Sequence, residues 1–356
     1  LTIPPGVVFK MTSTARLNVF GTLLAQGTAG APVVLTSIKD DAFGGDSNCD
    51  RGATLPAPGD WGNLNFTGTA SASNLAHVRV RYAGTSVAAA PEAAVALTAC
   101  HLAATHLRVE LVAAACLDLK GSSLPIVSNG AFDGGTIAVD GARFSALAGF
   151  TGCTASGNSI YDAIVATSGL VSTPATISAA NTLNASGVVV VSGNVDVNAT
   201  LTLHAGVIFK FVGPRTVNVN QTLFANGTSA APVVFTSIFD DAVGGDTDKD
   251  GGATTPAAGD WSRVLFNSQS DASVALHLHV RYAGGAASAA ILTAQSNCLL
   301  DGVVVQTSAS ACLSLQNNSY PTIRNCAFNG GTYAVRDVLI EAIPGFTNNT
   351  ASGNAV

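Results

Sequence analysis

The chain has 356 residues and a net charge of −6, and only 11% of its residues are charged although 47% are hydrophobic. No run of 18 or more apolar residues occurs, which excludes a helical membrane span, and the scattered lysines and arginines exclude the basic surface that nucleic-acid binding needs. The apolar residues are mostly small and aromatic residues are only 6%, which favours thin, regular layers over a bulky globular core.

Strand-like runs are short and frequent, and turns rich in Gly, Asn, Ser and Thr separate them. Long helical periodicity is absent, and hairpin signals are too sparse for a sandwich or a barrel. The runs recur about once per solenoid coil, roughly every 20–28 residues. We therefore predict an all-β solenoid, with strands in 17–25, 32–37, 63–66, 77–83, 106–112, 187–191, 200–211 and 302–306.

The sequence contains a tandem duplication, because a shift of 200 residues aligns it with itself. APVVLTSIKDDAFGGD at 31–46 matches APVVFTSIFDDAVGGD at 231–246, and 21 of 30 positions are identical between 31–60 and 231–260. After Gly84 the shift falls to 196. We predict two β-helical copies, 1–158 and 201–356, joined by a segment of coil or linker at 159–200.

The two copies are out of phase with the chain ends, since Leu1 matches Leu201 and Leu201 follows a strand-like stretch. We infer from this a segment cut from a longer array. The alternative is that a neighbouring copy supplies the missing coil, which would build a head-to-tail filament.

The order of motifs GVVFK, GTLLAQGT, PVVLTS, DDAFGGDSNCDRGATLPAPGDW and HVRVRYAG resembles the parallel β-helix repeats of very large bacterial surface proteins. The resemblance covers about 1–158 and 201–356 and weakens in between. It implies the pectin-lyase-like fold, a right-handed parallel β-helix. We expect the acidic stretches to be insertions between its coils. The resemblance also implies a secreted or cell-surface location, and it says less about activity.

Half of the 22 acidic residues lie in two stretches, 40–60 and 240–260. In the second stretch Asp246, Asp248 and Asp250 alternate and Gly251 follows, which resembles the opening of a calcium loop. Ala257 stands where an EF-hand would carry its bidentate Glu, so other ligands must complete the site. The candidates are Asp240, Asp241, Asp260 and backbone carbonyls.

The first stretch is a weaker version of the same pattern, with Asp46, Asn48 and Asp50, and with Arg51 in place of the glycine. We expect weaker calcium binding there, because Arg51 adds a positive charge. The remaining candidate ligands in this loop are Asp40, Asp41 and Asp60. The alternative for both loops is an exposed turn whose carboxylates are solvated. Trp61 and Trp261 are expected to pack each loop base against the solenoid.

The chain shows no set of residues typical of an active site. The adjacent pairs Asp40–Asp41 and Asp240–Asp241 belong to the acidic stretches and do not face each other across a sugar, as glycoside hydrolysis requires. Arg79, Arg81, Arg281, His77, His277 and His279 alternate with valine or leucine and are interpreted as a solvated strand face. We predict no catalytic residue, and hence no enzyme; a polysaccharide lyase or hydrolase is the less favoured alternative.

Seven cysteines occur without a CxxC pair, which indicates buried small hydrophobic residues and not a zinc site, with one or two disulfides as the alternative. The sequence therefore predicts a structural or adhesive extracellular solenoid stabilised by calcium. Its expected partners are copies of itself end to end or a surface glycan. Polysaccharide binding without catalysis is the alternative function.

Overall fold

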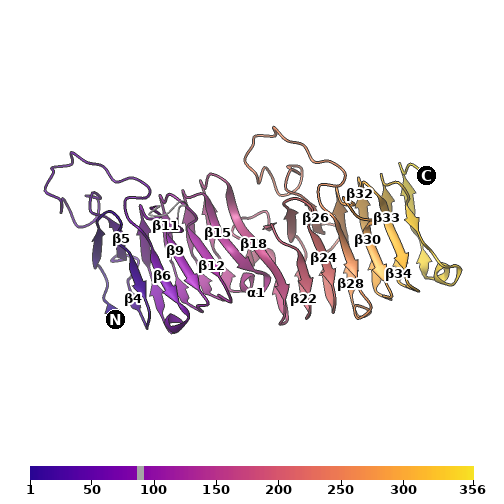
Figure 1. Cartoon of the computed structure of the whole chain (residues 1–356), viewed down its shortest axis with the longest axis horizontal. Helices are drawn as coiled ribbons and strands as arrows, with labels where there is room; N and C mark the ends of the chain where they lie inside the picture. The colour runs from indigo at the N-terminus through magenta and orange to yellow at the C-terminus, as the bar shows by residue number, and fades with distance from the viewer. Residues whose placement is uncertain (86–91) are drawn as a thin grey trace. The chain divides into compact units, whose positions relative to one another are not determined.

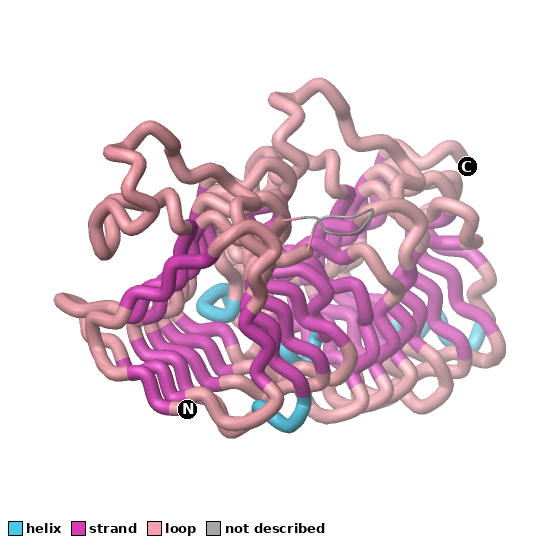
Figure 2. Tube along the Cα trace, turned by 60° about the vertical axis from the view of Figure 1, so that its left-hand side comes forward, coloured by secondary structure: helices cyan, strands magenta, loops and turns pink. Residues whose placement is uncertain are grey.

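The computed structural model describes residues 1–85 and 92–356, and nearly all its regular structure is β-strand. The helical segments of the described residues are one short helix and three 3-10 turns: α1 (Phe144–Leu147), η1 (Gly68–Ala70), η2 (Ala179–Asn181) and η3 (Ile340–Gly345). No helix among these residues is long and apolar enough to cross a membrane. The prediction of an all-β fold is confirmed (Figure 2).

The chain divides into two compact units. Unit 1 comprises Leu1–Val165 with Ala180–Asn184, and unit 2 comprises Ala166–Ala179 with Ala185–Val356. Strand β18 (Tyr161–Val171) runs from one unit into the other. The predicted copy boundaries at 158 and 200 stay predictions.

Unit 1 is a parallel β-solenoid in which each coil contributes one strand to each of three sheets (Figure 1). The first sheet contains β1 (Thr2–Ile3), β4 (Leu24–Gln26), β7 (Asn74–Ala76), β10 (Ala103–Thr105), β13 (Ile126–Ser128) and β16 (Phe150–Thr151). The second contains β2 (Val8–Met11), β5 (Val33–Ser37), β8 (Val78–Arg81), β11 (Arg108–Glu110), β14 (Ala131–Asp133) and β17 (Thr154–Ser156). The third contains β3 (Leu17–Val19), β6 (Leu64–Thr67), β9 (Val95–Thr98), β12 (Leu117–Lys120) and β15 (Ile137–Arg143).

Unit 2 repeats this architecture. Its first sheet contains β19 (Ala175–Ile177), β22 (Leu201–His204), β25 (Leu223–Asn226), β28 (Val274–Leu276), β31 (Leu299–Asp301), β34 (Thr322–Arg324) and β37 (Phe346–Thr347). The second contains β20 (Val188–Val191), β23 (Ile208–Phe211), β26 (Val233–Ser237), β29 (Leu278–Arg281), β32 (Val304–Gln306), β35 (Ala327–Asn329) and β38 (Thr350–Ser352). The third contains β21 (Val195–Val197), β24 (Thr216–Val219), β27 (Arg263–Phe266), β30 (Ala289–Ala294), β33 (Ala311–Gln316) and β36 (Val335–Arg336).

The strand register gives the length of a coil directly. In the first sheets Thr2 pairs with Leu24, Leu299 with Thr322 and Asn74 with Ala103, so the coils without an acidic stretch contain 22 to 29 residues, close to the predicted range. The coils that carry an acidic stretch are longer: Leu24 pairs with Asn74, 50 residues on, and Phe224 pairs with Val274 at the same separation. All these pairings are parallel, and crossovers between parallel strands are right-handed in nearly all proteins.

The core consists of small apolar side chains stacked from coil to coil, with aromatic residues at the loop bases. Trp61 and Trp261 are fully buried, and their Nε1 atoms donate to the carbonyls of Arg81 (2.6 Å) and Arg281 (2.7 Å). In unit 2 the ring of Trp261 also stacks on Phe211, 4.3 Å away. Each Trp thus ties a loop base to the neighbouring coil, as predicted.

Several runs predicted as single strands are two strands separated by a corner. The run 17–25 contains β3 and β4, and 200–211 contains β22 and β23. The corners need left-handed backbone, as at Gly206 (φ 80°), His77 (φ 46°) and His277 (φ 45°). The alternation of apolar and polar residues continues through such a corner, so the sequence pattern does not show where one strand ends and the next begins.

Six of the seven cysteines are buried, Cys49 is exposed, and none is in a disulfide. Burial raises the pKa of the Cys298 thiol to about 12 and that of Cys326 to about 11. These thiols are therefore protonated and unreactive, as expected for small hydrophobic core residues.

Candidate metal centre

Each acidic stretch forms a long loop at one corner of a single coil. The first loop leaves β5 after Ser37 and returns at β6, and the second leaves β26 after Ser237 and returns at β27. The loops therefore lie within a coil, between its second and third strands, and not between coils as expected from the sequence. A corner of a coil tolerates the insertion because the register on both sides is unaffected.

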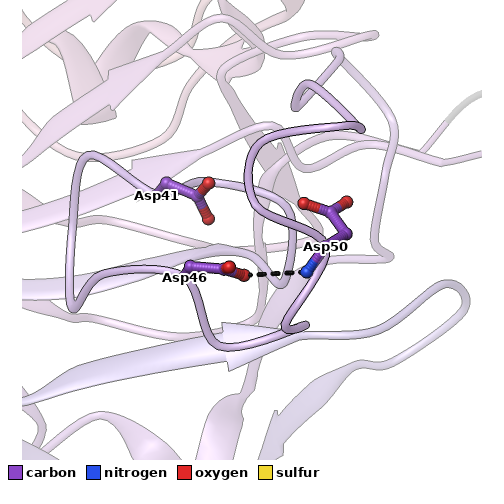
Figure 3. A group of neighbouring side chains, drawn as sticks. All are labelled: Asp41, Asp46 and Asp50. Atoms are coloured by element: carbon purple, nitrogen blue, oxygen red, sulfur yellow. Dashed lines mark hydrogen bonds between the residues drawn. The ribbon is translucent and has the colours of Figure 1, made fainter.

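Three carboxylates converge in each loop. Asp41, Asp46 and Asp50 each place an oxygen within 4.8 Å of the others (Figure 3), and Asp241, Asp246 and Asp250 do the same. Two oxygens that bind one ion at about 2.4 Å cannot be more than about 4.8 Å apart. Both clusters therefore have the dimensions to hold a metal ion.

Backbone amides of the loop fix two of the three carboxylates. Asp46 accepts hydrogen bonds from the N–H groups of Asp50 (3.2 Å) and Arg51 (2.9 Å). Asp50 accepts from Gly52 N–H (2.8 Å) and from both the N–H and the hydroxyl of Thr54. The hydroxyl and amide hydrogen bonds outweigh the effect of burial and lower the pKa of Asp50. Both carboxylates are thus held in place in the loop, and Asp50 is held in its ionised form.

Other oxygens beside each cluster are buried and have no hydrogen-bond partner among the described residues. In the first loop these are Asp41 Oδ1 and Asn48 Oδ1, and in the second they are Asp241 Oδ1 and Asp248 Oδ1. A buried acceptor without a partner costs about 1–3 kcal/mol, and a charged one costs more. A bound cation would remove this cost, so the donor set fits a hard metal ion.

The residue at the fourth acidic position differs between the copies. Burial, the hydrogen bond with Asp246 and the charge of Asp250 raise the pKa of Asp248. In the first loop Asn48 donates to Asp50 instead, at 2.8 Å. The second loop thus concentrates more negative charge, which favours a cation more strongly.

Four of the predicted ligands have other partners. Asp40 accepts from Thr36 Oγ1 (2.5 Å) and pairs with Arg81 (2.8 Å), while Asp240 accepts from Thr236 Oγ1 (2.6 Å) and pairs with Arg281 (3.2 Å). Neither belongs to the three-carboxylate cluster.

Asp60 and Asp260 close the loop base. Asp60 accepts from Ser37 Oγ (2.7 Å) and Ala57 N–H (3.0 Å) and pairs with Lys39 (2.8 Å). Asp260 accepts from Ser237 Oγ (2.6 Å) and Ala257 N–H (3.0 Å).

The sequence interpretation missed one lysine in each copy that donates a hydrogen bond to the acidic loop. Lys210 of β23 is fully buried and donates from Nζ to Gly245 O at 2.6 Å, and Lys10 donates to Gly45 O in the first loop. Burial lowers the pKa of Lys210, opposed by the nearby carboxylates, Asp240 and Asp241 foremost. The repeated lysine of GVVFK and GVIFK was the available signal.

Arg81 points outward from β8, as the alternation predicted, but the loop covers it. Its side chain is 12% exposed, pairs with Asp40 and Glu110, and lies over the ring of Phe43. The arginines on this face are therefore not a simple solvated surface.

No protein-family model and no curated protein matches the chain. Among solved structures it is similar to the catalytic domain of an α-1,3-glucanase of glycoside hydrolase family 87, in complex with nigerose, at 11% identity and a TM-score of 0.23. The match covers 100% of this chain and 60% of that one, so this chain spans less than two thirds of its length.

This match contradicts the prediction that the chain is not an enzyme, because the similar structure is the catalytic domain of a glycoside hydrolase. At a TM-score of 0.23 it identifies neither a reaction nor an active site here. The sequence argument considered residues close together along the chain, whereas a solenoid also brings together residues one coil apart.

Proposed function

We propose that the chain is a structural or adhesive β-solenoid module of a secreted or cell-surface protein, and that calcium binds its two acidic loops. The observation that carries the calcium proposal is the pair of three-carboxylate clusters, each with buried oxygens that lack a partner. Calcium prefers oxygen ligands such as carboxylates and amides, and it binds about six to eight of them. Water and backbone carbonyls would complete the set here.

Calcium would stabilise the loops without being needed for the solenoid itself. The strands pair through backbone hydrogen bonds that involve neither cluster, whereas each loop extends over more than twenty residues between its strands. Association of copies end to end is also part of the proposal, since a solenoid coil can pair with a further coil at its edge.

The test is calcium titration of the chelator-treated full chain by calorimetry, with melting curves in calcium and in chelator. Calcium at 100 times its dissociation constant should stabilise the protein by about 2.7 kcal/mol. Asp241→Asn should weaken the tighter site at least tenfold, because it removes charge from a carboxylate with an unpartnered oxygen. Glu341→Gln, an exposed carboxylate on η3, is the control and should change nothing. Absence of both heat and a melting shift would exclude calcium.

Polysaccharide binding is the second candidate, and a groove in unit 1 favours it.

A further inference from the structure

A cavity of about 330 Å³ opens on unit 1, at the size where small-ligand pockets begin. One wall is formed by Thr28, Ala29 and Pro32, in the turn between β4 and β5. The other wall is formed by two histidines and two arginines: His77, Arg79, His106 and Arg108. This lining contains no carboxylate, although the chain as a whole carries a net charge of −6.

The basic residues repeat from one coil to the next. Arg79 and Arg108 are register partners on β8 and β11, and the rings of His77 and His106 are stacked 4.4 Å apart and nearly parallel. Neighbouring parallel strands are about 4.8 Å apart. The groove therefore presents two guanidinium groups at the spacing of one coil.

The positive charge of these arginines is only partly compensated. Glu110 accepts from Arg79 Nη2 and Arg108 Nε at 2.6 Å each, and the same carboxylate also pairs with Arg81 at 2.9 Å. Arg108 Nη2 also lies 3.6 Å from Asp133 Oδ2. The Arg79 and Arg108 side chains remain 31% and 50% exposed, and Arg79 Nε is buried without a hydrogen-bond partner in the described structure.

Unit 2 has different residues at the positions that form this arrangement in unit 1. The register positions of Arg79 and Arg108 are occupied there by His279 and Val304, which are again partners, and Gln306 stands opposite Arg281 where Glu110 stands opposite Arg81. Gly302 replaces His106. A network needed only to hold these coils together would be expected in both copies, because the corresponding strands pair in both.

We propose that this groove binds an anionic saccharide, a sugar chain that carries carboxylate or sulfate groups. Arg79 and Arg108 would bind the acidic groups, because guanidinium groups match planar and tetrahedral oxyanions with paired hydrogen bonds. Ala29 and Pro32 offer an apolar wall to the ring carbons. Two cations are too few for the basic footprint of a nucleic acid. The site uses no ligand of the acidic loops, and its contact with the first loop is the ring of Phe43, which lies 5.0 Å from Arg79 Cζ.

The test measures binding of the full chain to three labelled oligosaccharides by fluorescence anisotropy: a heparin hexasaccharide, a hexagalacturonate and a neutral maltohexaose. We expect the sulfated or the carboxylated probe to bind, with an affinity that falls as salt rises, and maltohexaose not to bind. The two acidic probes distinguish sulfate from carboxylate recognition. Each measurement is made in calcium and in chelator, so that failure of the calcium proposal stays separate.

Arg79→Gln with Arg108→Gln should weaken binding at least tenfold. The matched control removes two exposed, ion-paired arginines elsewhere, Arg324→Gln with Arg336→Gln, and should leave the affinity unchanged. Ala29→Glu adds an anion to the groove without touching the arginine network, so it tests the site even if the double variant folds poorly; it should also weaken binding tenfold. No binding of either acidic probe, equal effects of the two double variants, or tighter binding of a DNA hexamer would overturn the proposal.

Discussion

Asp40 and Asp41 are neighbours in the sequence, yet their side chains have opposite surroundings. Asp40 is 2% exposed and is neutralised by Arg81, whereas Asp41 belongs to the carboxylate cluster and keeps an oxygen without a partner. In the second copy Asp240 likewise pairs with Arg281 and Asp241 belongs to the cluster, although Asp240 Oδ1 also lacks a hydrogen-bond partner among the described residues. Adjacent carboxylates can therefore coexist because one is part of the solenoid surface and the other is part of the loop.

The ion pair beneath the first loop should be important for stability. Arg81→Met leaves Asp40 buried with Thr36 as its remaining hydrogen-bond partner, and breaking a buried pair costs about 3–5 kcal/mol. Arg281→Met is the matched control: its distance to Asp240 is longer, 3.2 Å, and Gln306 replaces Glu110 beside it. We expect a clearly lower melting temperature for Arg81→Met than for Arg281→Met. Equal losses would show that the shorter distance to Asp40 and the contact with Glu110 add nothing beyond what the pair of Arg281 with Asp240 contributes.

Asp60 should make stability depend on pH. Burial raises its pKa, but the hydrogen bonds from Lys39, Ala57 and Ser37 outweigh burial and hold it below the usual value. A lowered folded-state pKa means that the stabilisation is complete above about pH 4 and is lost as the pH falls through the folded-state value.

Melting curves between pH 7 and pH 2 test this. Asp60→Asn should cost about 1 kcal/mol at pH 7, and the difference from the wild type should vanish at pH 2. Asp260→Asn is the matched variant without the lysine, because Phe239 stands at the position of Lys39, and it should cost less at pH 7. A loss for Asp60→Asn that persists at pH 2 would indicate damage to packing and not loss of the ion pair.

The two loops share one backbone conformation but differ in how well their residues suit it. Arg51 adopts φ 58° where Gly251 adopts φ 69°, and both N–H groups donate to the equivalent aspartate. Left-handed backbone costs a residue with a Cβ about 1–2 kcal/mol relative to glycine. Glycine keeps only part of this advantage, because it loses more conformational entropy on folding.

Arg51→Gly should therefore stabilise the first loop, by up to about 1 kcal/mol relative to Arg51→Ala. Both variants remove the charge, so the comparison isolates the backbone term, and amide hydrogen exchange at Gly52 and Ala53 measures it within the loop. Arg51→Gly with Asn48→Asp should also bring the calcium affinity of the first loop close to that of the second. Equal exchange rates in the glycine and alanine variants would contradict the strain argument.

At the scale of the whole molecule, the sequence predicted the solenoid and its coil length, because small apolar residues and turns recur at that interval. It also located the acidic loops and the clusters of Asp46 and Asp246. It did not predict which oxygens would be neutralised by arginine, or that Lys210 would be buried. Those outcomes depend on which outer face of the solenoid a loop folds over. The apolar periodicity along one strand carries no information about contacts across the corner of a coil.

The register makes the coil itself a removable unit. Arg108 pairs with Ala131, 23 residues on, so deletion of residues 108–130 joins Leu107 to Ala131 and should let β14 pair with β8 in place of β11. Asp133 then occupies the position of Glu110 beside Arg81. Because each coil contacts only its neighbours, this variant should fold and give a β-sheet circular dichroism spectrum with a cooperative melt. Deletion of 108–129 removes one residue fewer and shifts the register by one, which turns Phe132 outward, so it should aggregate or melt far lower. If both deletions behaved alike, strand register would not be what determines the fold of this solenoid.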